Sequence, residues 1–175
     1  INDGDIYNYY DLFGEYLYDI EEIRIEDPYI RTHHQFNNLR NLVSTSIQVN
    51  NETNGKLLRK LHLVTVQPTE GYYHNKDFVD KDKAIQQQKD KLELLSQELS
   101  SAGIVFSYEF WSEYELHDRC LILSNGWYIS IGRGLDIFNS PKNKFEARPC
   151  KRTHVRITRI EDMASIKRKK REKRR

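Results

Sequence analysis

Residues 115–138 read ELHDRCLILSNGWYISIGRGLDIF, and this stretch predicts a β-hairpin. Residues 120–123 form a short apolar run, and residues 127–131 alternate between apolar and polar side chains, as residues in strands do. Asn125-Gly126 lies between the two runs. This dipeptide is the strongest short hairpin signal, because both central residues of a type I′ turn need a positive φ.

The open end of this hairpin gathers side chains that bind anions. A two-stranded hairpin places its first and last residues side by side, so His117 and Arg119 are expected to face the turn at Gly132, Arg133 and Gly134. Two guanidinium groups, an imidazole and the backbone N–H groups of a glycine-rich turn suit a phosphate or another anion. The alternative is a structural turn, in which the histidine and the arginines make only local hydrogen bonds and ion pairs.

The sequence on both sides of the hairpin predicts an α/β fold. Helices are expected over residues 10–18, 31–47 and 80–101, further strands over residues 21–30, 61–67, 104–110 and 153–159, and long loops over residues 48–56 and 68–79. Strands that alternate with helices in this way favour one sheet with helices covering its faces.

The composition is that of a soluble globular domain of ordinary size. The chain has 175 residues, of which 31% are charged and 38% are hydrophobic. No apolar run approaches the roughly 20 residues that a membrane-spanning helix needs. Cys120 and Cys150 are too few for a disulfide framework or a metal cluster, and they favour a reducing, intracellular location. We therefore predict neither a cofactor nor a metal site.

Two further polar positions are expected to be structural. Side chains that are adjacent in a helix point about 100° apart, so His33 and His34 cannot easily face one metal ion together. Asp27 ends the first expected strand, at the edge where open α/β sheets often bind ligands. Because Pro28 follows it, a turn role is the favoured interpretation of Asp27.

Charge is distributed unevenly along the chain. Residues 167–175 hold eight basic side chains and one glutamate, a net charge of +7, and because the whole chain carries +2, the rest carries −5. This basic tail is able to bind an anionic membrane, a nucleic acid or a nuclear import receptor, and the alternative is a solvated, disordered end. Lys142 and Lys144 begin a second basic segment, residues 142–152, which either extends an anion-binding face or is a solvated loop.

From about residue 10 to residue 160, the sequence resembles the phospholipase D-like domain at the C-terminus of MIT (microtubule-interacting and trafficking) domain proteins. The motifs that carry the resemblance lie in the family's order and are IEDPYIR at 25–31, HQ at 34–35, HDR at 117–119, NGW at 125–127, IGRGLD at 131–136 and RPC at 148–150. The resemblance implies the fold of a single phospholipase D half, with a mixed sheet flanked by helices. Residues 1–9 are then expected to be a flexible lead-in, residues 10–160 the domain, and residues 161–175 a disordered basic tail.

The resemblance also implies a function. In the animal member of the family, this domain forms homodimers, binds acidic phospholipids, above all phosphoinositides, and is recruited to the midbody by ESCRT-III filaments during cytokinetic abscission. The expected partners are therefore an acidic phospholipid membrane, a second copy of the chain, and ESCRT-III proteins bound through MIT helices that precede the domain in the family. The expected location is the cytoplasm, at the surface of endosomes or of the midbody. Nucleic acid is a further possible partner, bound through the basic tail.

Phospholipase D chemistry uses a motif H-x-K-x4-D, in which the histidine attacks phosphorus and the lysine holds the phosphoryl oxygens. The resemblance places His117 at the nucleophile, but Arg119 replaces the lysine and Ser124 replaces the aspartate. Arginine still binds phosphate bidentately, whereas a nucleophilic histidine needs a partner that orients it. We therefore favour phosphate binding without turnover, by His117, Arg119, Gly132, Arg133, Gly134, Lys142 and Lys144.

Two alternatives stay open. The first is a phosphodiesterase or nuclease of the phospholipase D superfamily that uses His117, with Asp118 or Asp136 in the place of the motif aspartate. The second is a dimerisation and protein-docking module that binds no ligand and keeps the altered motif for its fold alone.

Overall fold

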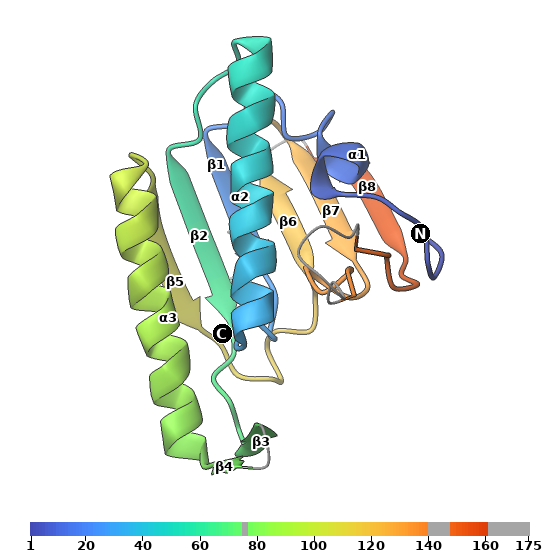
Figure 1. The fold of residues 1–175 in the computed structure, drawn as a ribbon. Helices are drawn as coiled ribbons and strands as arrows, with labels where there is room; N and C mark the ends of the chain where they lie inside the picture. Colours follow the sequence, from blue (N-terminus) through green and yellow to red (C-terminus); the bar gives the residue numbers. More distant parts are fainter. Residues whose placement is uncertain (75–76, 140–147, 161–175) are drawn as a thin grey trace.

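A computed structural model describes residues 1–74, 77–139 and 148–160 of the chain (Figure 1). Its helices are α1 (Tyr9–Phe13), α2 (His33–Thr53) and α3 (Lys81–Ser101). Its strands are β1 (Glu22–Glu26), β2 (Lys60–Thr65), β3 (Tyr72–His74), β4 (Asp77–Val79), β5 (Val105–Phe110), β6 (Cys120–Leu123), β7 (Trp127–Ile131) and β8 (Val155–Arg159). Within these described ranges, every helix is too short or too polar to cross a membrane.

Six strands form one mixed sheet in the order β5-β2-β1-β6-β7-β8, so that β5 and β8 are its edges. β1, β2 and β5 run parallel to one another, while β6, β7 and β8 are each antiparallel to the strand before them in this order. β3 and β4 form a separate small hairpin, inside the residues that we expected to be a long loop. The expected α/β fold with a mixed sheet flanked by helices is confirmed.

The described helices all lie on one face of this sheet. In Figure 1, α1, α2 and α3 lie in front of the strands. Paired residues of neighbouring strands share a face, so the register puts Ile23, Leu61 and Leu123 beneath the helices and Arg24 and Ile122 on the opposite face. The main apolar core fills the layer between the helices and the first of these faces. In the described part of the chain, helices thus cover one face, whereas the sequence led us to expect both.

Helix α2 is longer than the sequence indicated. It follows Thr32, whose side chain accepts a hydrogen bond from the backbone of Gln35 in a capping box. It continues through residues 48–53, which we expected to be a loop. The reason lies in Asn50, which is buried and donates a side-chain hydrogen bond to the carbonyl oxygen of Leu17 (2.9 Å). An asparagine, a residue typical of loops, serves here in tertiary packing.

The central hairpin is present, but its turn is not the expected type I′. Gly126 has a φ of +92°, whereas Asn125 is not among the described residues with a positive φ. The N–H of Gly126 donates to the carbonyl oxygen of Leu123 (3.0 Å), so the turn begins one residue earlier than expected. The side chain of Asn125 explains the difference, because its Nδ2 donates to two carbonyl oxygens of the loop after α1, at 2.9 and 2.7 Å.

The first residues of the chain lie against a much later segment. The N–H of Gly4 donates to the carbonyl oxygen of Cys150 (2.9 Å), and the N–H of Cys150 donates to the carbonyl oxygen of Asp5 (2.7 Å). Residues that we expected to form a flexible lead-in are therefore hydrogen-bonded to the segment before β8.

We predict that Asn125→Ala lowers the free energy of unfolding by about 1–2 kcal/mol, because two carbonyl groups lose the donor that satisfies them. Urea denaturation followed by circular dichroism measures this change. Asn51→Ala is the control, since Asn51 is exposed in α2 and alanine is the better helix former. Equal losses in the two variants would contradict the role assigned to Asn125.

Candidate anion-binding site

A small pocket lies at the carboxyl end of β1. It has a volume of about 190 Å³ and is lined by Asp27, Tyr29, Gln35, Arg119, Arg133 and Asp136. These residues come from the loop after β1, the first turn of α2, the segment before β6 and the turn after β7. The two ends of the central hairpin therefore meet the end of the first strand, which the sequence analysis did not include in the site.

Asp27 joins these segments. Its carboxylate is buried and accepts hydrogen bonds from the N–H groups of Tyr29 and Leu135, both at 3.0 Å. Gly134 permits the second bond, because it has a φ of +59° and a Cβ at this position would collide with the Asp27 carboxylate. We expected only a turn role for Asp27, and the hydrogen bond to Tyr29 is such a turn, but the aspartate also fixes the glycine-rich turn against β1.

The environment of Asp27 disfavours its charge. Burial raises the pKa of the Asp27 carboxyl above its usual range. The N–H groups of Tyr29 and Leu135 and the guanidinium of Arg119 oppose the rise, while the negative charge of Asp136 adds to it. The carboxylate thus depends on its hydrogen bonds and on Arg119 for stabilisation, and Arg119 is held close to it.

Arg119 is fixed on two sides. Its Nη1 donates to the carbonyl oxygen of Gly132 (3.1 Å), and its guanidinium carbon lies 4.5 Å from the centre of the Tyr29 ring. Such stacking of a guanidinium on an aromatic face is a cation–π contact, which restricts the side chain without neutralising it. Arg119 is therefore a positioned positive charge at the wall of the pocket.

Arg133 supplies the second guanidinium. Its backbone N–H donates to the hydroxyl of Thr153 (3.2 Å), and its Nε donates to the carbonyl oxygen of Arg152 (3.0 Å). Neither contact is with a carboxylate, and Arg133 is exposed. The structural alternative expected local ion pairs for this arginine, for example with Asp136 or Glu115, and these two contacts are instead hydrogen bonds to a hydroxyl and to a carbonyl oxygen.

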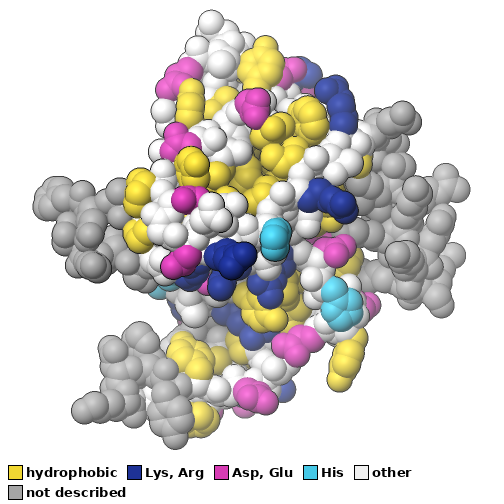
Figure 2. Space-filling model, turned by 90° about the vertical axis from the view of Figure 1, so that its right-hand side faces the viewer, with side chains coloured by type: hydrophobic (Ala, Val, Ile, Leu, Met, Phe, Trp, Pro, Cys, Tyr) yellow, Lys and Arg dark blue, Asp and Glu magenta, His cyan; other side chains and the backbone are white. Residues whose placement is uncertain are grey.

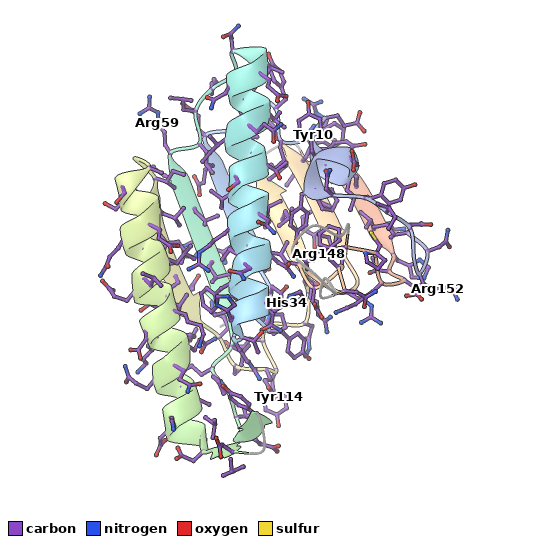
Figure 3. The ribbon with its side chains drawn as sticks, viewed as in Figure 1. Tyr10, His34, Arg59, Tyr114, Arg148 and Arg152 are labelled. Carbon is purple, nitrogen blue, oxygen red and sulfur yellow. The ribbon has the colours of Figure 1, made fainter. Side chains whose placement is uncertain are left out.

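Asp136 is instead bound by other cationic or hydrogen-bonding groups. Lys151 Nζ lies 2.8 and 2.9 Å from its two carboxylate oxygens, and His34 Nε2 lies 3.1 Å from Oδ1. His34 therefore has a structural role at the N-terminal end of α2, visible at the lower end of that helix in Figure 3. The adjacent His33 is exposed, and metal sites of three or more His, Cys, Asp or Glu residues are not found among the described residues.

A second set of hydrogen bonds holds the turn after β7 through the carbonyl oxygen of Leu135. The carbonyl oxygen of Leu135 accepts from Asn38 Nδ2 and from the hydroxyl of Tyr9, both at 2.9 Å. Asn38 Oδ1 in turn accepts from Arg148 Nη2 (2.9 Å). The segment after β7 is thus held by α1, α2 and the residues before β8, so the pocket is built by tertiary contacts and not by the hairpin alone.

The backbone N–H groups of the glycine-rich turn are already used. Gly132 donates to the carbonyl oxygen of His154 (2.9 Å), Gly134 donates to that of Ile131 (2.9 Å), and Leu135 donates to Asp27. We expected these groups to bind the anion. The structure uses them to shape the turn, so the guanidinium groups of the two arginines are the donors that face the pocket.

The remaining predicted site residues lie elsewhere. His117 is exposed and is not among the described residues that line the pocket. Lys142 and Lys144 lie outside the described residues. Regular strand pairing begins only at Cys120, and His117 lies in the segment that leads into it. Of the histidine and the two arginines that we expected to converge, the structure brings together Arg119 and Arg133.

The sequence analysis left three pocket residues out of the site, although it noted that one of them, Asp27, ends a strand at an edge that often binds ligands. Gln35 belongs to a T-x-x-Q capping box, a signal that the sequence does contain, and its side chain accepts from the N–H of Thr32 (2.8 Å). Asp27 and Tyr29 follow β1 and become part of the site because β1 pairs with β6. That pairing is a long-range contact, and periodicity within one segment carries no information about it.

A larger cleft lies between the N-terminal segment and α2. It has a volume of about 500 Å³ and is lined by Ile6, Tyr7, Asn8, Tyr9, Asp11, Asn41, Ser44, Thr45, Gln48, Phe138 and Arg148. Arg148 already donates to Asn38 and to the carbonyl oxygen of Asn139. Burial also lowers the pKa of Arg148. The smaller pocket, with its two guanidinium groups, is therefore the better candidate for an anion.

We predict that Gly134→Ala lowers the free energy of unfolding by about 3 kcal/mol, because the new Cβ adds overpacking to an unfavourable φ. Gly103→Ala is the matched control, since Gly103 has a φ of +75° and a Cβ there would meet no atom within 4 Å. It should cost about 1 kcal/mol. Thermal and urea unfolding measure both, and equal costs would show that Asp27 does not require a glycine opposite it.

Comparison with known proteins agrees with this architecture. Residues 7–159 match the family described as the phospholipase D-like domain at the C-terminus of MIT. The chain is also 35% identical, over 159 residues, to MIT domain-containing protein 1 of Mus musculus, and the match covers 86% of this chain and 56% of that protein. The chain thus spans about half the length of this relative. It belongs to the family of phospholipase D-like domains found at the C-terminus of MIT proteins.

Proposed function

We propose that this domain binds the headgroups of anionic phospholipids, above all phosphoinositides, in the pocket lined by Arg119 and Arg133, and that it acts as a non-catalytic membrane adaptor. The observation that carries the proposal is the presence of two guanidinium groups at one open pocket. In the contacts described above, the hydrogen bonds of both side chains go to carbonyl oxygens, and only Arg119 also stabilises the charge of a carboxylate, that of Asp27. The nearby Asp136 is bound by Lys151, and Asp27 by backbone N–H groups.

Guanidinium groups suit phosphate because their N–H donors form two parallel hydrogen bonds with its oxygens. Arg119 is held by Tyr29 and by the carbonyl oxygen of Gly132, so little side-chain freedom is lost when it binds a ligand. Arg133 is exposed and able to reach a second oxygen or a second phosphate. A pocket of about 190 Å³ is smaller than typical small-molecule pockets and suits a phosphate group better than a large ligand.

The position of the pocket adds a favourable field. Gln35 lies in the first turn of α2, a helix of 21 residues, and lines the pocket. The N-terminal end of a helix carries the positive end of its dipole and favours anions. Figure 2 shows, on the side of the molecule that carries β8 and the N-terminal segment, Lys and Arg side chains gathered next to an apolar patch. These features support an anionic surface as the partner.

Binding without turnover is the better interpretation of the same pocket. The nucleophile of phospholipase D chemistry is a histidine beside the phosphate, whereas His117 does not line this pocket in the described structure. Metal-independent cleavage of bis-p-nitrophenyl phosphate that is lost in His117→Ala would contradict the adaptor function. It would establish instead a phosphodiesterase or nuclease.

We further propose that the domain works as a homodimer in ESCRT-III-linked membrane remodelling or cytokinetic abscission, at the surface of endosomes or of the midbody. This proposal is supported by the family to which the domain belongs and by its similarity to a protein named as containing an MIT domain. Two pockets in one dimer would raise the avidity for a membrane without a new contact.

We predict that Arg133→Glu weakens binding to phosphoinositide vesicles by about 10- to 100-fold, the effect of losing a charge-assisted hydrogen bond. Co-sedimentation with neutral, phosphatidylserine and phosphoinositide vesicles measures it, with and without residues 167–175. Arg59→Glu is the control, because Arg59 is exposed and lies at the opposite end of the sheet from His34 (Figure 3). It changes the net charge equally and should leave the selectivity intact.

Two results would contradict the assignment of this pocket. If Arg133→Glu binds phosphoinositide vesicles as the unmodified chain does, the pocket is not the binding site. If selective binding vanishes when residues 167–175 are removed, the folded domain does not select the headgroup.

A further inference from the structure

Arg31 lies just outside the anion-binding pocket described above. It follows β1 and precedes α2. Its backbone N–H donates to Gln35 Oε1 (2.9 Å), and its guanidinium carbon lies 5.6 Å from the centre of the Tyr29 ring. Tyr29 and Gln35 both line the pocket, whereas Arg31 is not among its lining residues. The function proposed above therefore leaves this third guanidinium group without a role.

The ring of Tyr29 relates Arg31 to Arg119. Their guanidinium carbons lie 5.6 and 4.5 Å from the centre of this one ring, so the two cations are no farther apart than the sum of these distances. Cation–π contacts of this kind restrict both side chains without neutralising them. One positive charge thus stands at the wall of the pocket and a second beside it, both within the span of one small ligand.

The carboxylate that pairs with Arg31 holds it only weakly. Arg31 Nη2 lies 3.4 Å from Glu113 Oε1, and the Glu113 side chain is 51% exposed. The same oxygen accepts a long hydrogen bond from the hydroxyl of Thr69 (3.5 Å). An exposed ion pair contributes little, because water solvates both charges. A phosphate monoester carries more negative charge than a carboxylate and is therefore able to displace Glu113.

The guanidinium of Arg31 is fixed at its base and retains donors at its end. Its Nε is buried without a hydrogen-bond partner in the part of the chain that the structure describes. Within those residues, the hydrogen bond to Glu113 is the contact that its terminal nitrogens make. Because a guanidinium carries five N–H donors, further donors remain for a second acceptor.

The size of the pocket decides where a second phosphate would lie. A volume of about 190 Å³ suits one phosphate group, which the donors of Arg119 and Arg133 face. A second phosphate of the same ligand has to lie at the rim. Lys151 is already bound to both carboxylate oxygens of Asp136. Arg31, in contact with two lining residues, is the better placed cation.

We propose that Arg31 forms a second phosphate subsite, so that the ligand is a headgroup with two phosphates on one ring. This inference rests on the proposed function, because the first phosphate is the one held by Arg119 and Arg133. The second phosphate takes the place of the Glu113 carboxylate on Arg31. The same chemistry occurs in a membrane lipid and in a soluble inositol bisphosphate.

The variant Arg31→Gln tests the subsite in the full chain. Co-sedimentation is measured with phosphatidylcholine vesicles that carry phosphatidylinositol monophosphates or bisphosphates. We expect the unmodified chain to bind the bisphosphate vesicles about ten-fold more tightly, and Arg31→Gln to lose this preference, as the loss of a charge-assisted hydrogen bond implies. Monophosphate binding should change less than about two-fold, which also shows that the pocket of the variant is folded. Arg59→Gln, at the opposite end of the sheet, is the control for net charge.

The variant Glu113→Gln tests the same subsite in the opposite direction. Removing the competing carboxylate should strengthen bisphosphate binding by about two- to three-fold, the size expected of an exposed ion pair. Glu93→Gln is the matched control, because Glu93 is exposed on α3 and the charge changes equally. Equal gains in the two variants would show a general effect of charge and would contradict the subsite.

Further results would overturn the inference without touching the proposed function. These are equal affinity of the unmodified chain for both kinds of vesicle, and an Arg31→Gln variant that weakens both equally or neither. Isothermal titration with soluble inositol monophosphate and bisphosphate separates the two ligand sources. A loss of preference confined to the soluble ligands would overturn the role of the subsite at a membrane. If Arg133→Glu weakens binding to neither kind of vesicle, the proposed function fails, and this inference fails with it.

Discussion

The carboxylate of Asp27 is the interaction on which the candidate site depends. It connects the end of β1 to the turn after β7 through the N–H groups of Tyr29 and Leu135. The bond to Leu135 requires a residue without a Cβ at position 134. Arg119 is held beside this contact by the carbonyl oxygen of Gly132 and by the ring of Tyr29. A buried carboxylate is unfavourable by itself, and here hydrogen bonds and one guanidinium stabilise it. The shape of the pocket is therefore set by a polar contact between segments and not by packing in the apolar core.

The sequence was informative wherever a local pattern decides the structure. The alternation over residues 127–131 predicted β7, the apolar stripe over residues 80–101 predicted α3, and Gly126 marked the hairpin. The motifs identified the family, and with it the mixed sheet. Arg119 and Arg133 were found because a hairpin brings its two ends together, a rule that needs no knowledge of the rest of the fold.

Other features depended on contacts that no local pattern records. The turn at Asn125 shifted by one residue because two carbonyl groups from the loop after α1 accept its side-chain amide. Residues 48–53 became helical because the buried Asn50 has tertiary partners. Asp27 joined the site because β1 pairs with β6. In each case the side chain of an asparagine or aspartate, a residue type that usually indicates a loop, forms a hydrogen bond with a backbone group distant in the sequence.

The position of β5 at the edge of the sheet has a consequence for experiments on self-association. Its sequence, VFSYEF, contains a single charge, Glu109, and both Val105 and Tyr108 are exposed. An edge strand of this kind presents backbone hydrogen-bonding groups and apolar side chains to other molecules. Both favour aggregation by strand pairing between chains. Association that grows without limit as the protein is concentrated would report this edge. A closed assembly of two chains would instead reach a fixed mass, and light scattering distinguishes the two.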